Sequence, residues 1–148
     1  MIEPMCSPII TSPYGNRIDP FDTNKMQFHD GIDIVPCYDD PNIYAIANGK
    51  ITYDMDDYNP ALKYFKGHTG GNMIIICHSI DDVSYYVRYL HLEANFYNKG
   101  DYVTEGAIIG KYGDYGISKG KHLHIDFYTM SWEKIDPTPL FNAHGLLL

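Results

Sequence analysis

The sequence predicts an all-β fold, an antiparallel β-sheet domain with long loops between some of its strands. The apolar stretches are short and rich in Ile, Val, Tyr and Phe, and Gly, Asn, Asp or Pro separates them. Such punctuation is typical of strands and turns rather than of helices. No apolar pattern keeps a 3.6-residue period over three turns, and the length of 148 residues suits a single domain over residues 1–148.

The clearest predicted element is a hairpin around the dipeptide Asn48-Gly49. The segments at residues 43–47 and 50–53 flank this dipeptide, and Asn-Gly tolerates the positive φ angles that a type I′ turn requires. Further strands are predicted at residues 72–78, 85–90, 107–112 and 123–128. Long loops are expected at residues 54–71 and 117–121, and the first contains an ordered segment at residues 58–66.

The composition argues against nucleic-acid binding and against a membrane-spanning segment. The net charge is -8, from 11 Lys and Arg against 19 Asp and Glu, so the chain cannot easily supply the basic face that nucleic acid requires. The longest purely apolar run, at residues 73–77, is far too short for a membrane span. No nucleic-acid partner and no membrane span are therefore expected. We expect a monomer, although no motif determines the oligomeric state.

Two short motifs bring histidine and carboxylate side chains together. His29 and Asp33 stand four residues apart, and His122 and His124 stand two apart around Leu123. On an extended segment, positions separated by an even number share a face, so the side chains of each motif can converge. Imidazole and carboxylate are a usual ligand mix for catalytic zinc, which keeps one coordination position open for water.

The residue types leave the roles of these side chains open. A further histidine, His91, strengthens the case for a metal site. The alternative is that the histidines are surface or core residues satisfied by local hydrogen bonds. Both His122 and His124 could bind zinc, or one could bind while its neighbour transfers protons. His78 is interpreted as a residue at a strand end rather than as a ligand.

Seven segments, taken in chain order, resemble the lysostaphin- and LytM-type zinc metallopeptidases, whose fold is the duplicated hybrid motif. I-T-S-P-Y-G-N-R at residues 10–17 looks like their opening segment, and H-D-G-I-D-I at residues 29–34 matches their first metal motif. G-K-H-L-H-I at residues 120–125 ends in their H-L-H motif. Similar segments lie between them, at residues 43–51, 71–78, 89–92 and 100–113. The expected family core is therefore about residues 10–128.

Carried over position by position, the resemblance implies one catalytic Zn²⁺ held by His29, Asp33 and His124. His91 and His122 are then the two catalytic histidines that do not bind the metal. One of them would take the proton of a zinc-activated water, and the other would orient that water or stabilise the oxyanion of the scissile carbonyl. His122 is a candidate for the general base, but the resemblance does not decide between the two. The long loops would border the zinc groove.

The implied activity is cleavage of peptide bonds in bacterial peptidoglycan, in the stem peptide or the cross-bridge. One alternative is a metal-retaining, non-catalytic scaffold that binds the wall or regulates other wall hydrolases, and another is an enzyme for other Gly-rich peptides. All five site positions are intact, which favours the enzyme. The bond cleaved stays open because residues 113–119 are bulkier than the short Gly-Thr-Gly-like stretch of the family, and residues 19–28 lack a tyrosine found in some relatives.

Two residues in or beside the motifs, Gly31 and Asp126, have either a supporting role at the metal or a purely structural one. Gly31 either lets the backbone turn closely around the metal or is a structural glycine. Asp126 stands where relatives often carry Glu and could orient a ligand imidazole, but a surface carboxylate is the favoured interpretation.

The sequence shows no obvious means by which the protein would reach the cell wall. Residues 1–6 lack a basic region followed by an apolar stretch, so no secretory signal is visible. The resemblance implies action at the cell wall, outside the cell. We therefore expect delivery by a bacteriophage, as a released lysin or on the virion, or removal of a leader before residue 1. No upstream blocking segment is visible, so an uninhibited catalytic domain is expected.

Overall fold

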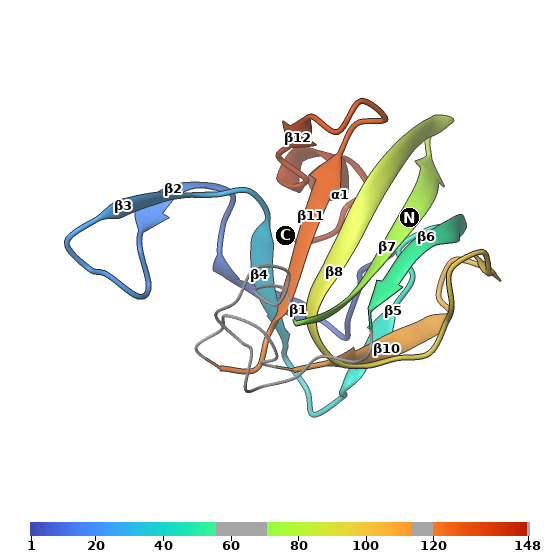
Figure 1. Cartoon of the computed structure of the whole chain (residues 1–148), viewed down its shortest axis with the longest axis horizontal. Helices are drawn as coiled ribbons and strands as arrows, with labels where there is room; N and C mark the ends of the chain where they lie inside the picture. Colours follow the sequence, from blue (N-terminus) through green and yellow to red (C-terminus); the bar gives the residue numbers. More distant parts are fainter. Residues whose placement is uncertain (56–70, 114–119, 148) are drawn as a thin grey trace.

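One antiparallel sheet holds most of the strands in the described residues, and the predicted fold class is confirmed (Figure 1). The computed structural model describes residues 1–55, 71–113 and 120–147. Within these ranges the main sheet has ten strands. Its path runs in the order β1 (Pro8–Ser12), β4 (Ile32–Pro36), β11 (Leu123–Tyr128), β8 (Val83–Asn95), β7 (Asn72–Ile80), β6 (Gly49–Met55) and β9 (Tyr102–Val103).

Shorter elements complete the described part of the fold. β10 (Ile108–Tyr112) pairs with β8 and with β5 (Asn42–Tyr44), and β12 (Lys134–Ile135) pairs with β11. β2 (Gly15–Ile18) and β3 (Met26–His29) form a separate hairpin, which projects from one side of the sheet in Figure 1. α1 (Thr138–Ala143) is a short helix that buries Phe141. No helix in the described ranges is long and apolar enough to cross a membrane.

The two faces of the main sheet differ because side chains alternate along each strand. On β11, Leu123, Ile125 and Phe127 are fully buried in the hydrophobic core. The alternate residues of the strand, among them His124 and Asp126, therefore point to the opposite face, which we call the site face. Cross-strand partners share a face, so the functional side chains of neighbouring strands gather on this side of the sheet.

Four predicted strands lie where the sequence places them. The segments at residues 72–78, 85–90, 107–112 and 123–128 correspond to β7, β8, β10 and β11. The predicted ordered segment at residues 58–66 lies outside the described residues, as do most of the two predicted loops at residues 54–71 and 117–121.

The predicted hairpin around Asn48-Gly49 is wrong. β5 pairs with β10, whereas β6 pairs with β7 and β9, so the two flanking segments are not neighbours in the sheet. Neither Asn48 nor Gly49 is among the residues with positive φ, which a type I′ turn requires. Gly49 instead permits a close approach of β7, because a Cβ there would lie 2.6 Å from the backbone oxygen of Cys77.

His78 lies near the end of β7 and is fully buried in the core. Its Nδ1 is 3.2 Å from the carbonyl oxygen of Asn48, which can only accept, so Nδ1 carries the proton. The Tyr89 hydroxyl then donates to Nε2 of His78 at 2.8 Å. Burial lowers the pKa of His78 from its usual value of 6.5 to about 4, so the folded protein holds this ring neutral.

We expect the free energy of unfolding to decrease as the pH falls from 6.5 towards about 4. In this window the unfolded chain binds a proton at His78 and the folded chain does not, so acid favours the unfolded state by up to roughly 3 kcal/mol. Urea unfolding of the wild type and of His78→Gln at several pH values measures the effect. Gln keeps a neutral donor and acceptor, so an equal pH dependence in both proteins would contradict this role of His78.

Candidate metal centre and active site

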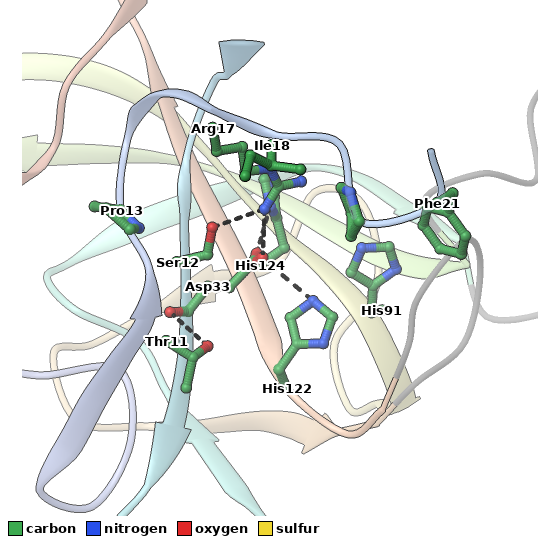
Figure 2. Close-up of a pocket in the computed structure, with 11 residues that line it drawn as sticks. Thr11, Ser12, Pro13, Arg17, Ile18, Phe21, Asp33, His91, His122 and His124 are labelled. Carbon is green, nitrogen blue, oxygen red and sulfur yellow. Dashed lines mark hydrogen bonds and ion pairs between the residues drawn. The ribbon is translucent and has the colours of Figure 1, made fainter. Parts of the chain in front are cut away.

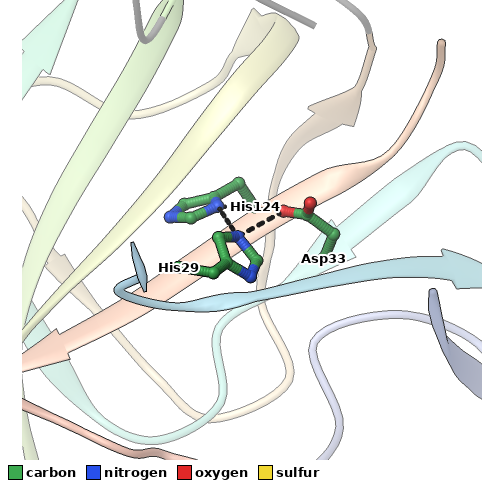
Figure 3. Close-up of side chains that lie close together, drawn as sticks. All are labelled: His29, Asp33 and His124. Atoms are coloured by element: carbon green, nitrogen blue, oxygen red, sulfur yellow. Dashed lines mark hydrogen bonds and ion pairs between the residues drawn. The ribbon is translucent and has the colours of Figure 1, made fainter. Parts of the chain in front are cut away.

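Side chains from three different strands meet at one point on the site face (Figure 3). His29 ends β3, Asp33 lies in β4, and the antiparallel register sets Asp33 opposite His124 of β11. Asp33 Oδ1 lies 2.9 Å from His124 Nδ1 and 3.3 Å from His29 Nε2, and the two nitrogens are 3.1 Å apart. The structure thus brings together the three residues predicted as ligands, which we call the His–Asp cluster.

In each imidazole ring of the cluster, one nitrogen faces away from Asp33. The hydrogen bond that this nitrogen makes determines which nitrogen of the ring carries the proton. His29 Nδ1 donates to the carbonyl oxygen of Pro13 at 2.9 Å, because a carbonyl oxygen can only accept. His124 Nε2 donates to Asp126 Oδ2 at 3.0 Å. In the neutral rings, the lone pairs of His29 Nε2 and His124 Nδ1 therefore point toward each other and toward Asp33 Oδ1.

Three electron-rich atoms this close repel one another unless a cation lies between them. Burial opposes the charge of Asp33, but when a proton rather than a metal ion lies between these atoms, hydrogen bonds from His124 and His29 hold the pKa of its carboxyl well below the usual range. Burial also disfavours a charged His124, yet the carboxylates of Asp126 and Asp33 outweigh it and raise the pKa of His124. The ligand atoms lie within 4.8 Å of one another, and the donor set fits a metal ion that prefers nitrogen and oxygen ligands.

The expectation that Asp126 is a surface carboxylate is wrong. Asp126 is fully buried, and Arg88, its partner across the β8–β11 pair, donates two hydrogen bonds to it, at 2.8 and 2.7 Å. Burial favours the protonated acid, but hydrogen bonds from His124 and Arg88 lower the pKa of Asp126. The ionised carboxylate accepts from His124 Nε2 and so directs Nδ1 of that ring into the His–Asp cluster.

Arg17 of β2 is a site residue that the sequence analysis did not single out. Its Nη1 donates to Asp33 Oδ2 at 3.2 Å and to Ser12 Oγ at 2.7 Å, and its Nε donates to Gln27 Oε1 at 3.0 Å. Because Arg17 binds Oδ2, the other oxygen of Asp33 is directed to the histidines. The available signal was the position of Arg17 at the end of the segment at residues 10–17.

Gly31 permits the close approach of the chain to β11 beside the cluster. A Cβ at this position would lie 2.5 Å from the backbone oxygen of Ile125 and 2.8 Å from His124 Nε2. A side chain here would displace either the strand or the imidazole, so Gly31 is required for close packing against β11, and its expected role around the metal stays a prediction.

The two remaining predicted histidines lie beside the cluster (Figure 2). The ring centroids of His91 and His122 are 5.0 Å apart, and that of His91 is 6.0 Å from that of His124. His122 Nδ1 donates to the carbonyl oxygen of Gly120 at 2.8 Å, so its Nε2 presents a lone pair, 3.6 Å from Asp33 Oδ1. His91 has a φ of 63°, a left-handed conformation that is strained for this residue and typical of functional sites.

The cluster opens into a cavity of about 480 Å³, a volume typical of small-ligand sites. One side of the cavity carries Asp33, His91, His122 and His124. The chain in and after β2 supplies an apolar portion of the lining, and the remaining lining residues come from β1 and the turn that follows it. The apolar portion consists of Ile18, Pro20 and Phe21. The second group consists of Thr11, Ser12 and Pro13, and Arg17 also lines the cavity (Figure 2). The cavity therefore combines an apolar surface with titratable groups.

Solved structures with this fold define the class of protein. The catalytic domain of lysostaphin from Staphylococcus simulans is 29% identical, with a TM-score of 0.67, and the match covers 86% of this chain and 87% of that one. A zinc-containing peptidase from Vibrio cholerae is 28% identical, with a TM-score of 0.64, and the match covers 86% of this chain and 35% of that one. The fold is that of a lysostaphin-type peptidase domain.

The sequence also matches a peptidase family directly. Residues 27–137 match peptidase family M23. The DD-carboxypeptidase/endopeptidase Mpg of Neisseria meningitidis serogroup B is 35% identical over 127 residues, which are 84% of this chain and 25% of that protein. The chain thus spans about a quarter of the length of this relative. The chain belongs to peptidase family M23, and the predicted relationship to lysostaphin-type enzymes is confirmed.

Replacement of Asp126 by Asn is expected to weaken Zn²⁺ binding by about 10- to 100-fold, because the carboxylate that orients His124 is lost. Competition with a chromophoric chelator measures the dissociation constant. Zinc affinity equal to that of the wild type would contradict the orienting role of Asp126.

A double variant separates this role from a purely structural one. Asp126→Asn alone leaves Arg88 buried beside a neutral partner, which can destabilise the fold. Arg88→Met with Asp126→Leu removes the whole ion pair without leaving an unpaired charge. We expect this protein to unfold at a temperature similar to that of the wild type in the absence of zinc and still to bind zinc weakly.

Proposed function

We propose that this chain is a zinc endopeptidase that cleaves peptide bonds in bacterial peptidoglycan, with His29, Asp33 and His124 as the zinc ligands. The observation that carries the proposal is the convergence of these three donors in a cavity that also presents the lone pair of His122. A set of three protein ligands leaves a coordination position for a reacting group, which distinguishes catalytic zinc sites from structural ones.

Zinc in this position supplies Lewis-acid polarisation of the scissile carbonyl and allows water to act as a nucleophile near neutral pH. The protons are handled by the protein. We assign His122 as the general base, because the carbonyl of Gly120 holds the proton on Nδ1 and leaves Nε2 to accept the proton of the attacking water. The same ring then returns a proton to the departing amine.

His91 is assigned the second catalytic role. Its ring lies 5.0 Å from that of His122 and lines the same cavity. From this position a ring N–H can donate to the oxygen of the scissile carbonyl as negative charge develops there. The left-handed backbone of His91 supports this assignment, because packing alone gives little reason to hold a strained residue at the cavity.

The relatives support a wall peptide as the substrate. One is named a DD-carboxypeptidase/endopeptidase, and the lysostaphin domain is described as an antimicrobial peptidase. The apolar side of the cavity, at Ile18, Pro20 and Phe21, suits a peptide with small apolar side chains such as alanine. Action at the cell wall follows from this substrate, and release as a phage lysin is one route by which the enzyme would reach it.

We expect zinc-loaded protein to release soluble fragments with new free amino termini from purified peptidoglycan, and a chelator to abolish the release. His122→Ala is expected to lower kcat by about 10²- to 10⁴-fold, because the proton acceptor is lost. Mass spectrometry of the fragments measures the cleavage and identifies the bond.

Metal analysis and two further variants complete this test. His122→Ala should keep one zinc per chain, whereas His29→Ala should lose both zinc and activity. His144→Ala is the matched control, because His144 follows α1 and contacts Asp81 rather than the cluster, so its activity should be that of the wild type. If the wild type holds one zinc and cleaves no wall, the peptidase proposal fails and a non-catalytic scaffold is favoured.

A further inference from the structure

Three aromatic side chains, two half-buried and one exposed, gather at a place on the surface that does not line the cavity. They are Tyr86 of β8, Tyr128 of β11 and Trp132 in the connection between β11 and β12, and we call them the aromatic platform. The rings of Tyr86 and Trp132 are stacked, with centroids 4.2 Å apart and 7° between their planes. The ring of Tyr128 lies 5.5 Å from that of Trp132. Trp132 is 50% exposed, so the flat apolar surface that faces solvent is the side of its ring turned away from Tyr86.

A tight turn holds Trp132 over Tyr86. The backbone N–H of Trp132 donates to the carbonyl of Thr129 at 2.9 Å, and that of Glu133 donates to Thr129 Oγ1 at 3.1 Å. Within this turn Trp132 has a φ of 61°, which is strained for a large side chain. A ring that stays half exposed recovers only part of the hydrophobic gain that full burial would give. The stability of the fold is thus a weak reason for this conformation.

The aromatic platform lies on the same face of the sheet as the His–Asp cluster. Tyr128 stands opposite Tyr86 in the β8–β11 register, and Asp126 stands opposite Arg88. His124, Asp126 and Tyr128 alternate along β11 and therefore share the site face. Four residues of extended strand span about 13 Å, so the platform and the cluster lie close enough for one polymer to contact both.

Polar groups border the platform on the side of the cluster. Arg88 Nη2 donates to the Tyr128 hydroxyl at 3.0 Å, and the guanidinium lies over the Tyr128 ring, 5.0 Å from its centroid. The salt bridge of Arg88 to Asp126 fixes its position. A flat apolar ring beside fixed hydroxyl and guanidinium groups suits a ligand with an apolar face and a hydroxyl-bearing edge. A sugar ring has this combination.

We propose that the aromatic platform binds a sugar ring of the glycan strand of peptidoglycan, and that the glycan is held there while its attached peptide reaches the His–Asp cluster. This inference rests on the proposed function, because the glycan is the polymer that carries the substrate peptide. The continuity of the platform with the cluster along β11 favours this occupant over a separate protein partner.

Trp132 is the one tryptophan of the chain, so its fluorescence reports on the platform directly. We expect peptide-free glycan chains to change the tryptophan emission of zinc-loaded protein in a saturable manner, and free stem peptide to leave it unchanged. Tyr86→Ala should weaken glycan binding by about tenfold, the scale of one lost aromatic contact. Tyr102→Ala is the matched control, because Tyr102 is an exposed tyrosine on β9, away from the platform.

A kinetic comparison tests the same surface in the working enzyme. Trp132→Ala should raise KM for intact peptidoglycan by about tenfold and leave kcat unchanged, because the lost contact is a binding contact. Cleavage of a short wall peptide without sugars should be unaffected. Thermal unfolding of Trp132→Ala shows whether the fold is retained, and Tyr86→Ala gives an independent reading of the same surface.

The outcomes distinguish this inference from the proposed function. No change in emission with glycan, or equal glycan binding by Tyr86→Ala and the wild type, would overturn the glycan site. A response to free stem peptide instead of glycan would also overturn it, in favour of a peptide subsite. Glycan binding by a protein that cleaves no wall would sustain the glycan site and refute the peptidase proposal.

Discussion

The register between β4 and β11 is the constraint on which the site depends. It sets Asp33 opposite His124 and, by alternation, sends Leu123 and Ile125 into the core opposite Ile34 and Ile32. A slip of one residue would turn the histidine into the core and the leucine to the cavity. Burial of four apolar side chains opposes this slip, so the hydrophobic core determines which residues meet at the His–Asp cluster.

Two guanidinium groups maintain the charge pattern of the site. Arg17 binds Asp33, and Arg88 binds Asp126, so each carboxylate beside His124 has a cationic partner on the side away from the ring. Against the effect of burial, hydrogen bonds from His124 and His29 keep the pKa of Asp33 low, and those from His124 and Arg88 keep the pKa of Asp126 low, so both carboxylates stay ionised. Neither arginine lies in the histidine motifs, yet Arg17 orients Asp33 directly and Arg88 orients His124 through Asp126.

The features of the site that depend on short segments of sequence were predicted correctly. The spacings within His29–Asp33 and His122–His124 led to the expectation that these side chains converge, and they do so in the structure. His91 was a further histidine noted from the sequence, and the family resemblance implied its role. The pattern of apolar segments correctly gave the fold class and four strands. Alternation of side chains along one extended segment accounts for His122 and His124, whereas His29 and Asp33 lie on different strands, β3 of the hairpin and β4 of the main sheet.

The sequence predictions that were wrong or missing concern contacts between segments that are distant in the sequence. Asn48-Gly49 is a local turn signal, but pairing of β5 with β10 and of β6 with β7 determined the path of the chain. The assignment of Asp126 to the surface was wrong because the sequence did not show its partner. Asp126 is buried against Arg88, and only the register between β8 and β11 places these two residues opposite each other. The aromatic platform joins two strands and a turn in the same way. Sheet order was not available from the sequence alone, so these features were not either.

Diffraction from zinc-loaded crystals at the zinc absorption edge tests the proposed metal centre most directly. We expect one anomalous peak, about 2.0–2.2 Å from His29 Nε2, Asp33 Oδ1 and His124 Nδ1. Asp30, His124 and Asp126 form a second group of possible ligands, on the other nitrogen of the same imidazole. A peak among those three residues, or none near His124, would contradict the proposed centre.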